Sequence, residues 1–118
     1  MMRLVICLIL ACALTAHAIS PVIVTTYAKR YSDAARAHPN RRYHPDRMNV
    51  AAGWRSLYGK TLVIYSGFLR VRVRVTDVMN ARYDTATVLR IDASPRVMKS
   101  LNMKHGGPVD SVEIVDAP

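Results

Sequence analysis

The sequence has few cysteines, which cross-link small folds, and no excess of the glycines and prolines that break helices and strands. It contains only two cysteines, Cys7 and Cys12, and both lie in the first apolar run of the chain. The rest of the chain therefore has no thiol, which excludes a disulfide-rich scaffold and thiol chemistry. Five glycines and six prolines are not an enrichment in 118 residues. We find no internal repeat or low-complexity tract, so the composition is that of an ordinary globular domain.

Long apolar runs are absent too. The first run, over residues 4–14, is too short to span a bilayer, and no later run is longer. It follows a short positive start that contains Arg3 and precedes the small-residue signal Ala16-His17-Ala18. This order predicts a secretory signal peptide over residues 1–18, cut after Ala18.

Export follows from that prediction. We expect a secreted or periplasmic protein without a membrane span, folded as one domain over residues 19–118 and acting as a monomer. One alternative is a lipoprotein signal, which would leave Cys12 lipidated at the new N-terminus. A chain of 100 residues can bury roughly 60–70% of its unfolded surface, enough for one core without staples.

Acidic residues are scarce. The chain has 17 lysines and arginines against 8 aspartates and glutamates. Without Arg3, which leaves with the signal, the net charge is about +8, and such a field attracts polyanions. For an exported protein we expect peptidoglycan or another anionic cell-wall polysaccharide as partner. We expect no nucleic acid, because of the export and because no aromatic residues are interleaved with the arginines of residues 69–76. The charge could also serve solubility alone.

Motifs for metals, phosphates and covalent nucleophiles are missing as well. The histidines at 38, 44 and 105 show no metal-ligand spacing. There is no glycine-rich phosphate loop and no serine or cysteine nucleophile pattern. We therefore predict no metal and no cofactor.

What the chain does have is strand periodicity. Residues 69–76 read L-R-V-R-V-R-V-T, a strict alternation that places three valines on one face and three arginines on the other. Ser94 and Pro95 have the positions of an N-cap and a first helical residue. The polar stretch over residues 28–47 reads as a long loop with a possible helical turn. We predict strands over residues 21–27, 48–52, 60–65, 69–76, 88–91 and 109–115, and a helix over 94–101. This is an all-β fold, a small barrel of six strands with one or two short helices.

Two aspartates close strand-like runs. Asp77 follows the alternating run, and Asp92 follows the β-branched run that ends at Ile91. Two strands that each deliver one carboxylate to neighbouring positions would build a carbohydrate-processing cleft. In the other interpretation, both aspartates cap turns or a helix.

The same residues resemble the double-psi β-barrel domains, specifically the three-aspartate (3D) domain. The similarity lies in Gly59-Lys60-Thr61-Leu62-Val63-Ile64, in Val75-Thr76-Asp77-Val78-Met79-Asn80-Ala81-Arg82-Tyr83 and in Arg90-Ile91-Asp92. More loosely the pattern is similar to the barrels of rare lipoprotein A, membrane-bound lytic transglycosylase A and the expansins. The resemblance implies a six-stranded double-psi β-barrel over residues 19–118. In the N-terminal half Thr26-Tyr27 and Ser32-Asp33 match more weakly, and residues 41–47 replace the family's Thr-Ala-x-Gly segment.

The resemblance also implies a reaction. Lytic transglycosylases on this barrel cleave the bond between N-acetylmuramic acid and N-acetylglucosamine and leave a 1,6-anhydro sugar. One carboxyl group can serve as acid and then as base. Asp92 is the expected acid, because its apolar neighbours Ile91 and Ala93 should raise its pKa, and Asp77 is its expected partner, whose charge would raise the pKa of one of the two further.

Further residues are expected to bind substrate. Arg82 could hold a lactyl or peptide carboxylate, or form a surface pair with Asp84. Trp54, the only tryptophan, could stack on a sugar or anchor a turn. The predicted substrate-binding residues are Thr26, Tyr27, Asp33, Arg82 and Trp54, of which Thr26 and Tyr27 could equally be ordinary strand residues.

Three classes of function remain open. The first is a peptidoglycan lytic transglycosylase, which the two aspartates favour. The second is a non-catalytic, expansin-like polysaccharide binder, favoured by the missing Thr-Ala-x-Gly segment and the positive charge. The third is a secreted protein-binding or protease-inhibitor module on the same fold, since a fold alone does not decide function.

Overall fold

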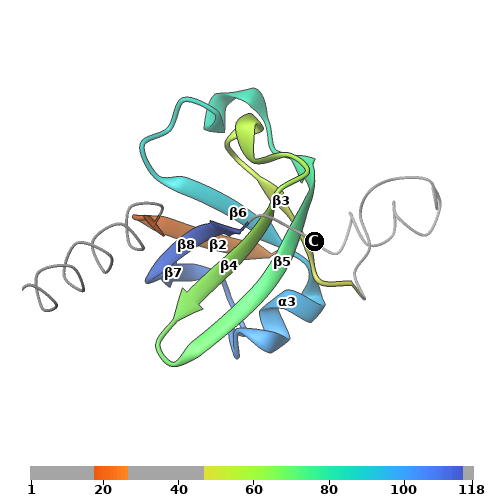
Figure 1. Cartoon of the computed structure of the whole chain (residues 1–118), viewed down its shortest axis with the longest axis vertical. Coiled ribbons are helices and arrows are strands. Elements are labelled where there is room, and N and C mark those ends of the chain that lie inside the picture. The colour runs from red at the N-terminus through yellow and green to blue at the C-terminus, as the bar shows by residue number, and fades with distance from the viewer. Residues whose placement is uncertain (1–17, 27–46, 116–118) are drawn as a thin grey trace, which may run out of the picture.

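Eight strands in a single sheet make up most of the described chain, which a computed structural model covers over residues 18–26 and 47–115 (Figure 1). The strands are β1 (Ala18–Ile19), β2 (Val22–Thr26), β3 (Asn49–Ala52), β4 (Thr61–Ser66), β5 (Leu69–Val78), β6 (Leu89–Ala93), β7 (Gly107–Val109) and β8 (Ser111–Val115). Within these described ranges, the helical elements are α3 (Pro95–Ser100) and the short 3₁₀ turns η1 (Arg55–Leu57) and η2 (Ala81–Tyr83). The prediction of an all-β fold is confirmed.

The strand count differs from the predicted six. Asp110 splits the last predicted strand into β7 and β8, because its backbone N–H donates to Tyr65 O (2.9 Å) and its carboxylate accepts from Gly67 N (2.8 Å). In addition, β1 pairs with β8 through Ala18 and Ile19. The order is β1-β8-β4-β5-β3-β6-β2-β7, so the hydrogen-bonded sheet is open rather than a closed barrel. Only Asp110 separates β7 from β8, so the chain connects the end strand β7 directly to β8, the second strand from the other end of the sheet.

The pairings have an internal two-fold pattern. The parallel pair β2·β6 corresponds to the parallel pair β5·β3, and the antiparallel pair β2·β7 corresponds to β5·β4. Under this exchange of β2 with β5 and of β6 with β3, the antiparallel pair β3·β6 maps onto itself. The centre of this pattern is β3·β6, flanked by β5 on one side and β2 on the other.

Alternation along the strands builds the core. In β5, the valines at 71, 73 and 75 are buried, while the arginines at 70, 72 and 74 are exposed on the other face. In β2, Val22 and Val24 are buried in the same way. Fully buried large side chains from six strands and α3 fill the interior: Val22, Val24, Val50, Leu62, Ile64, Val73, Val75, Leu89, Ile91, Val97 and Val112.

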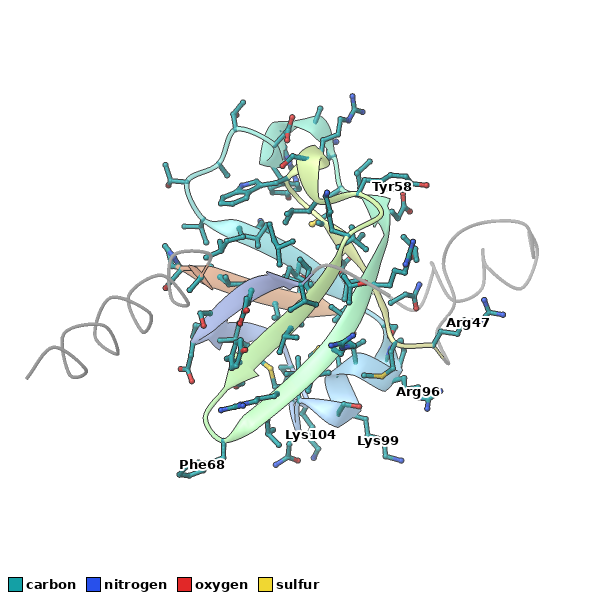
Figure 2. The ribbon with its side chains drawn as sticks, in the orientation of Figure 1. Arg47, Tyr58, Phe68, Arg96, Lys99 and Lys104 are labelled. Atoms are coloured by element: carbon teal, nitrogen blue, oxygen red, sulfur yellow. The ribbon has the colours of Figure 1, made fainter. Side chains whose placement is uncertain are left out.

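The predicted helix is confirmed as α3, one residue shorter at each end. Ser94 caps it by accepting a hydrogen bond from Val97 N (3.2 Å), and its hydroxyl donates to Arg47 O (2.6 Å). Lys99 and Lys104 lie at this end of the molecule, as does Phe68 at the tip of the β4–β5 hairpin, whereas Tyr58 lies at the opposite end (Figure 2).

Several predictions fall outside the described residues. These are the signal peptide up to residue 17, and all but the last residue of the loop predicted over 28–47. Within the described ranges, no helix is both long and apolar enough to cross a membrane.

Candidate functional site

The candidate site is a row of four residues that crosses four strands. Thr25 of β2 is the register partner of Asp92 in β6, and Asp92 is the partner of Ala51 in β3. Ala51 is in turn the partner of Asp77 in β5. The strand neighbours Val24 and Ile91 are fully buried, so Thr25 and Asp92 project from the outer face of the sheet. The fold thus brings both predicted aspartates into one row.

Asp92 is the group in this row with the clearest chemical signature. Thr25 Oγ1 donates a hydrogen bond to Asp92 Oδ1 at 3.0 Å. Burial raises the pKa of the half-buried Asp92 carboxyl above its ordinary value, and the hydrogen bond from Thr25 and the positive charge of Arg90 lower it by smaller amounts. A carboxyl group with a raised pKa keeps its proton to higher pH and can serve as a general acid.

Asp77 is in the same row but on the far side of β3. Two strand spacings separate it from Asp92, about 10 Å between Cα atoms, with the small side chain of Ala51 between them. Its Oδ1 accepts a hydrogen bond from the N–H of Val78 at 2.8 Å. Asp77 is not among the causes of the raised pKa of Asp92, which comes first from burial. The expected coupling of the two carboxylates is therefore absent here.

A β-bulge decides which side chain of β5 joins the row. The register shifts between Val50 and Ala51, so that Val50 pairs with Val75 but Ala51 pairs with Asp77. Thr76 is the extra residue, and its hydroxyl accepts a hydrogen bond from Asn49 Nδ2 at 3.0 Å. Without the bulge, Thr76 would lie beside Ala51; bulges re-aim side chains in this way near functional sites.

Arg82 does not form the predicted alternative pair with Asp84. The Asp84 carboxylate instead accepts a hydrogen bond from Arg55 N at 2.8 Å. Arg82 lies against Tyr83, with its guanidinium carbon 4.7 Å from the ring centroid, and its Nη2 donates to the Tyr83 hydroxyl at 2.6 Å. Arg90, which sequence reasoning gave no role, lies 4.8 Å from the centroid of the same ring.

A buried glycine makes this stacking possible. A Cβ atom on Gly53 would lie 3.2 Å from Tyr83 Cβ and 3.4 Å from Arg90 O. The backbone of Gly53 is fixed to β6 by a hydrogen bond to Arg90 O (2.8 Å). Because Gly53 has no side chain, Tyr83 of η2 can approach the backbone at Gly53, and its ring lies against Arg90.

Trp54 has the contacts of an anchor. The half-buried indole packs against the core, and its Nε1 donates to Ala86 O at 2.9 Å. This bond ties the segment after η2 to the turn that follows β3. The structure therefore favours the second interpretation of Trp54 over a sugar-stacking platform.

On β2, the residue that contacts Asp92 is Thr25, the sequence neighbour of the predicted Thr26. Thr26 is exposed and pairs with Ala93, whereas Thr25 contacts Asp92. The alternation that begins with the buried Val22 and Val24 could have indicated Thr25, since it must face outwards. Tyr27 and Asp33 lie outside the described residues.

The comparisons with known proteins leave the site to be interpreted from its geometry. No protein-family model matches the chain, and no curated protein matches it. Within residues 18–26 and 47–115, no three histidine, aspartate or glutamate side chains gather in a group that could hold a metal ion. The described site thus offers one carboxyl group of raised pKa, a hydroxyl partner and two nearby arginines.

Proposed function

We propose that this protein is exported and acts on cell-wall glycan, cleaving peptidoglycan strands in the manner of a lytic transglycosylase with Asp92 as the acid and base. The single observation that carries the proposal is the Asp92 carboxyl group: it lies on the outer face of the sheet, accepts a hydrogen bond from Thr25, and has a pKa raised by burial. An exposed carboxyl group that serves only as a cap would have neither the burial nor the shift.

One carboxyl group is sufficient for this reaction. Protonated Asp92 gives its proton to the glycosidic oxygen as the bond to the sugar's C1 breaks. The Asp92 carboxylate then takes the proton of the C6 hydroxyl while that oxygen bonds to C1, which forms the anhydro ring without water. Thr25 stabilises the carboxylate between the two steps through its hydrogen bond. Hydrolysis with two cooperating carboxylates is less well supported, because Asp77 lies beyond β3.

The fold and charge agree with the proposal. Two parallel strand pairs, β2·β6 and β3·β5, flank the central antiparallel pair β3·β6, and this pseudo-symmetric all-β arrangement is compatible with the resemblance to double-psi barrels. The excess of lysine and arginine suits an anionic wall polymer. Asp77 lies in the same row as Asp92, on the far side of β3, and in this proposal it contacts the sugar that follows the cleaved bond along the glycan chain.

The test is a product analysis. The full chain, Asp92→Asn and the matched control Asp77→Asn are incubated with purified peptidoglycan sacculi, and soluble products are identified by mass spectrometry. We expect anhydro-muropeptides from the parent chain, a loss of about 100-fold or more in Asp92→Asn, and a smaller loss in Asp77→Asn. Equal activity of the parent chain and Asp92→Asn would remove Asp92 from the mechanism.

A non-catalytic glycan binder is the second candidate. The observation that favours it is the separation of the two aspartates. The Asp77 carboxylate accepts a hydrogen bond from Val78 N on its own strand, and Asp77 is not among the causes of the raised pKa of Asp92. In the same experiment this candidate predicts no soluble product and retention of the protein on pelleted sacculi. Neither product nor retention would favour a protein partner.

A further inference from the structure

Two arginines share one aromatic ring, and one of them, Arg90, lies two residues before Asp92 on β6. The guanidinium carbons of Arg82 and Arg90 lie 4.7 and 4.8 Å from the centroid of the Tyr83 ring. The electron-rich face of the ring attracts each cation. The cluster concentrates positive charge on the surface beside the candidate acid, which is the electrostatic requirement for binding an anionic group.

The nearby acidic side chains are engaged elsewhere. Asp84 follows Tyr83 in sequence, but its carboxylate accepts from Arg55 N. Asp92 accepts from Thr25 rather than from either arginine. Arg90 Nε is buried and has no hydrogen-bond partner in the described part of the chain. A buried donor without a partner is costly, and in native proteins such a group calls for an explanation. Neither of these two carboxylates is therefore paired with Arg82 or Arg90.

The position of Arg90 relates the cluster to Asp92. The two residues lie two positions apart on β6 and therefore on the same face, about 7 Å apart along the strand. Arg90 stacks on Tyr83, whose backbone rests on Gly53 just after β3, whereas Asp92 bonds to Thr25 on β2. The two side chains thus lean to opposite sides of β6. The distance between them is comparable with one sugar ring.

We propose that Arg90 and Arg82, both stacked on the Tyr83 ring, form a subsite for a carboxylate carried by the glycan that Asp92 acts on. A guanidinium presents paired N–H groups that match the two oxygens of a carboxylate, and stacking on an aromatic ring holds its plane in place. The inference rests on the proposed function and extends it: the sugar next to the cleaved bond is acidic, and its carboxylate binds on the β3 side of Asp92.

The experiment compares two glycans of equal length. One is the neutral tetrasaccharide of N-acetylglucosamine, and the other alternates N-acetylglucosamine with N-acetylmuramic acid, whose lactyl groups carry carboxylates. Their affinities for the full chain, Arg90→Gln and the control Arg72→Gln are measured by isothermal titration calorimetry. Arg72 is a suitable control because it is an exposed arginine on β5, away from Tyr83.

We expect the full chain to prefer the acidic glycan by about ten- to a hundred-fold, the range for hydrogen bonds to a charged group. Arg90→Gln should bind both glycans about equally, and Arg72→Gln should keep the preference. If Arg90→Gln does not fold by circular dichroism, Arg82→Gln at its exposed position takes its place, and a reduced preference is again the expected result.

The contrary outcomes separate the inference from the proposed function. An unchanged preference in the arginine variants, or equal affinity of the parent chain for both glycans, overturns the carboxylate subsite and leaves the proposed function standing. Binding of neither glycan by the parent chain overturns both.

Discussion

Thr25 and Asp92 face each other across the parallel strands β2 and β6, and the Thr25 hydroxyl donates to the Asp92 carboxylate at 3.0 Å. The same hydroxyl lies 3.4 Å from Ile91 O, a second acceptor that keeps it oriented towards β6. This hydrogen bond favours the charged form of Asp92, whereas burial favours the neutral form and has the larger effect. Thr25, together with the charge of Arg90, therefore limits how far the pKa of the candidate acid rises.

Replacing Thr25 tests this directly. Thr25→Val keeps the shape of the side chain but removes the donor, so the pKa of Asp92 should rise further, because a cause that lowers it is lost. The pKa can be followed by NMR titration of the aspartate carboxyl carbons. If the chain cleaves glycan, the high-pH limb of the pH–rate profile should move in the same direction.

Thr26→Val is the matched control for Thr25→Val. Thr26 is the next residue of the same strand, is exposed, and pairs with Ala93 rather than Asp92. Its replacement should leave the pKa of Asp92 where it is. Equal shifts in both variants would mean that the strand as a whole, not the hydroxyl of Thr25, controls the carboxyl group.

Burial of Asp92 also predicts how stability depends on pH. Its folded-state pKa is raised above the unfolded value, so the folded state binds the proton more tightly. Stability is therefore lost as the pH rises from the unfolded pKa, about 3.9, through the folded pKa. Asp92→Asn cannot ionise, so it should have a larger free energy of unfolding than the parent chain at pH 7. Chemical denaturation at several pH values measures the difference.

At pH 3 the advantage of Asp92→Asn should disappear, because Asp92 is then largely protonated in both states. A gain of equal size at pH 3 and pH 7 would assign the effect to packing or hydrogen bonding instead of charge. A variant that gains stability while losing glycan cleavage would place Asp92 among residues whose function costs stability.

The sequence predicts the local elements well because they depend on local patterns. The alternation in β5 and the cap at Ser94 give strand and helix within one or two residues of their observed bounds. The pairing of strands is different, since it is decided by contacts between distant segments. That β3 lies between β5 and β6, and so separates Asp77 from Asp92, cannot be read from either strand alone.

The same distinction applies to the site. Asp92 follows from its position at the end of an apolar run, but Thr25 requires knowing that β2 runs parallel to β6 in that register. The role of Tyr83 depends on Gly53, thirty residues earlier, which leaves room for the ring. The bulge at Thr76 shifts Asp77 into the row by one residue, a shift for which the alternation of residues 69–76 gives no sign.

Replacing Trp54 distinguishes a structural role in the fold from a role in stacking on a sugar. Trp54→Phe keeps an aromatic face but removes the hydrogen bond to Ala86 O. As an anchor, Trp54 should contribute about 1 kcal/mol through that bond, and its loss should appear in thermal denaturation while retention on sacculi is unchanged. Reduced retention without a loss of stability would instead identify Trp54 as a glycan contact.

Two adjacent glycines beside β2 offer the sharpest test of how closely the fold holds Thr25. A Cβ atom on Gly106 would lie 2.6 Å from Val24 O and 3.2 Å from Thr25 Cα, whereas one on Gly107 would meet only Met103 Cε, at an ordinary 3.5 Å. Gly106→Ala must therefore move the two backbones apart, and we expect it to displace the one that carries Thr25 at a cost of about 1–3 kcal/mol of stability. Gly107→Ala should change stability by about 0.5 kcal/mol or less.

The displacement should also reach the site. Because Thr25 would move relative to Asp92, Gly106→Ala should raise the pKa of Asp92 as Thr25→Val does, and Gly107→Ala should not. Chemical denaturation and the carboxyl NMR titration measure the two effects on the same samples. A Gly106→Ala variant as stable as the parent chain would mean that the segment before β7 yields instead of β2, and that the position of Thr25 does not depend on this close approach.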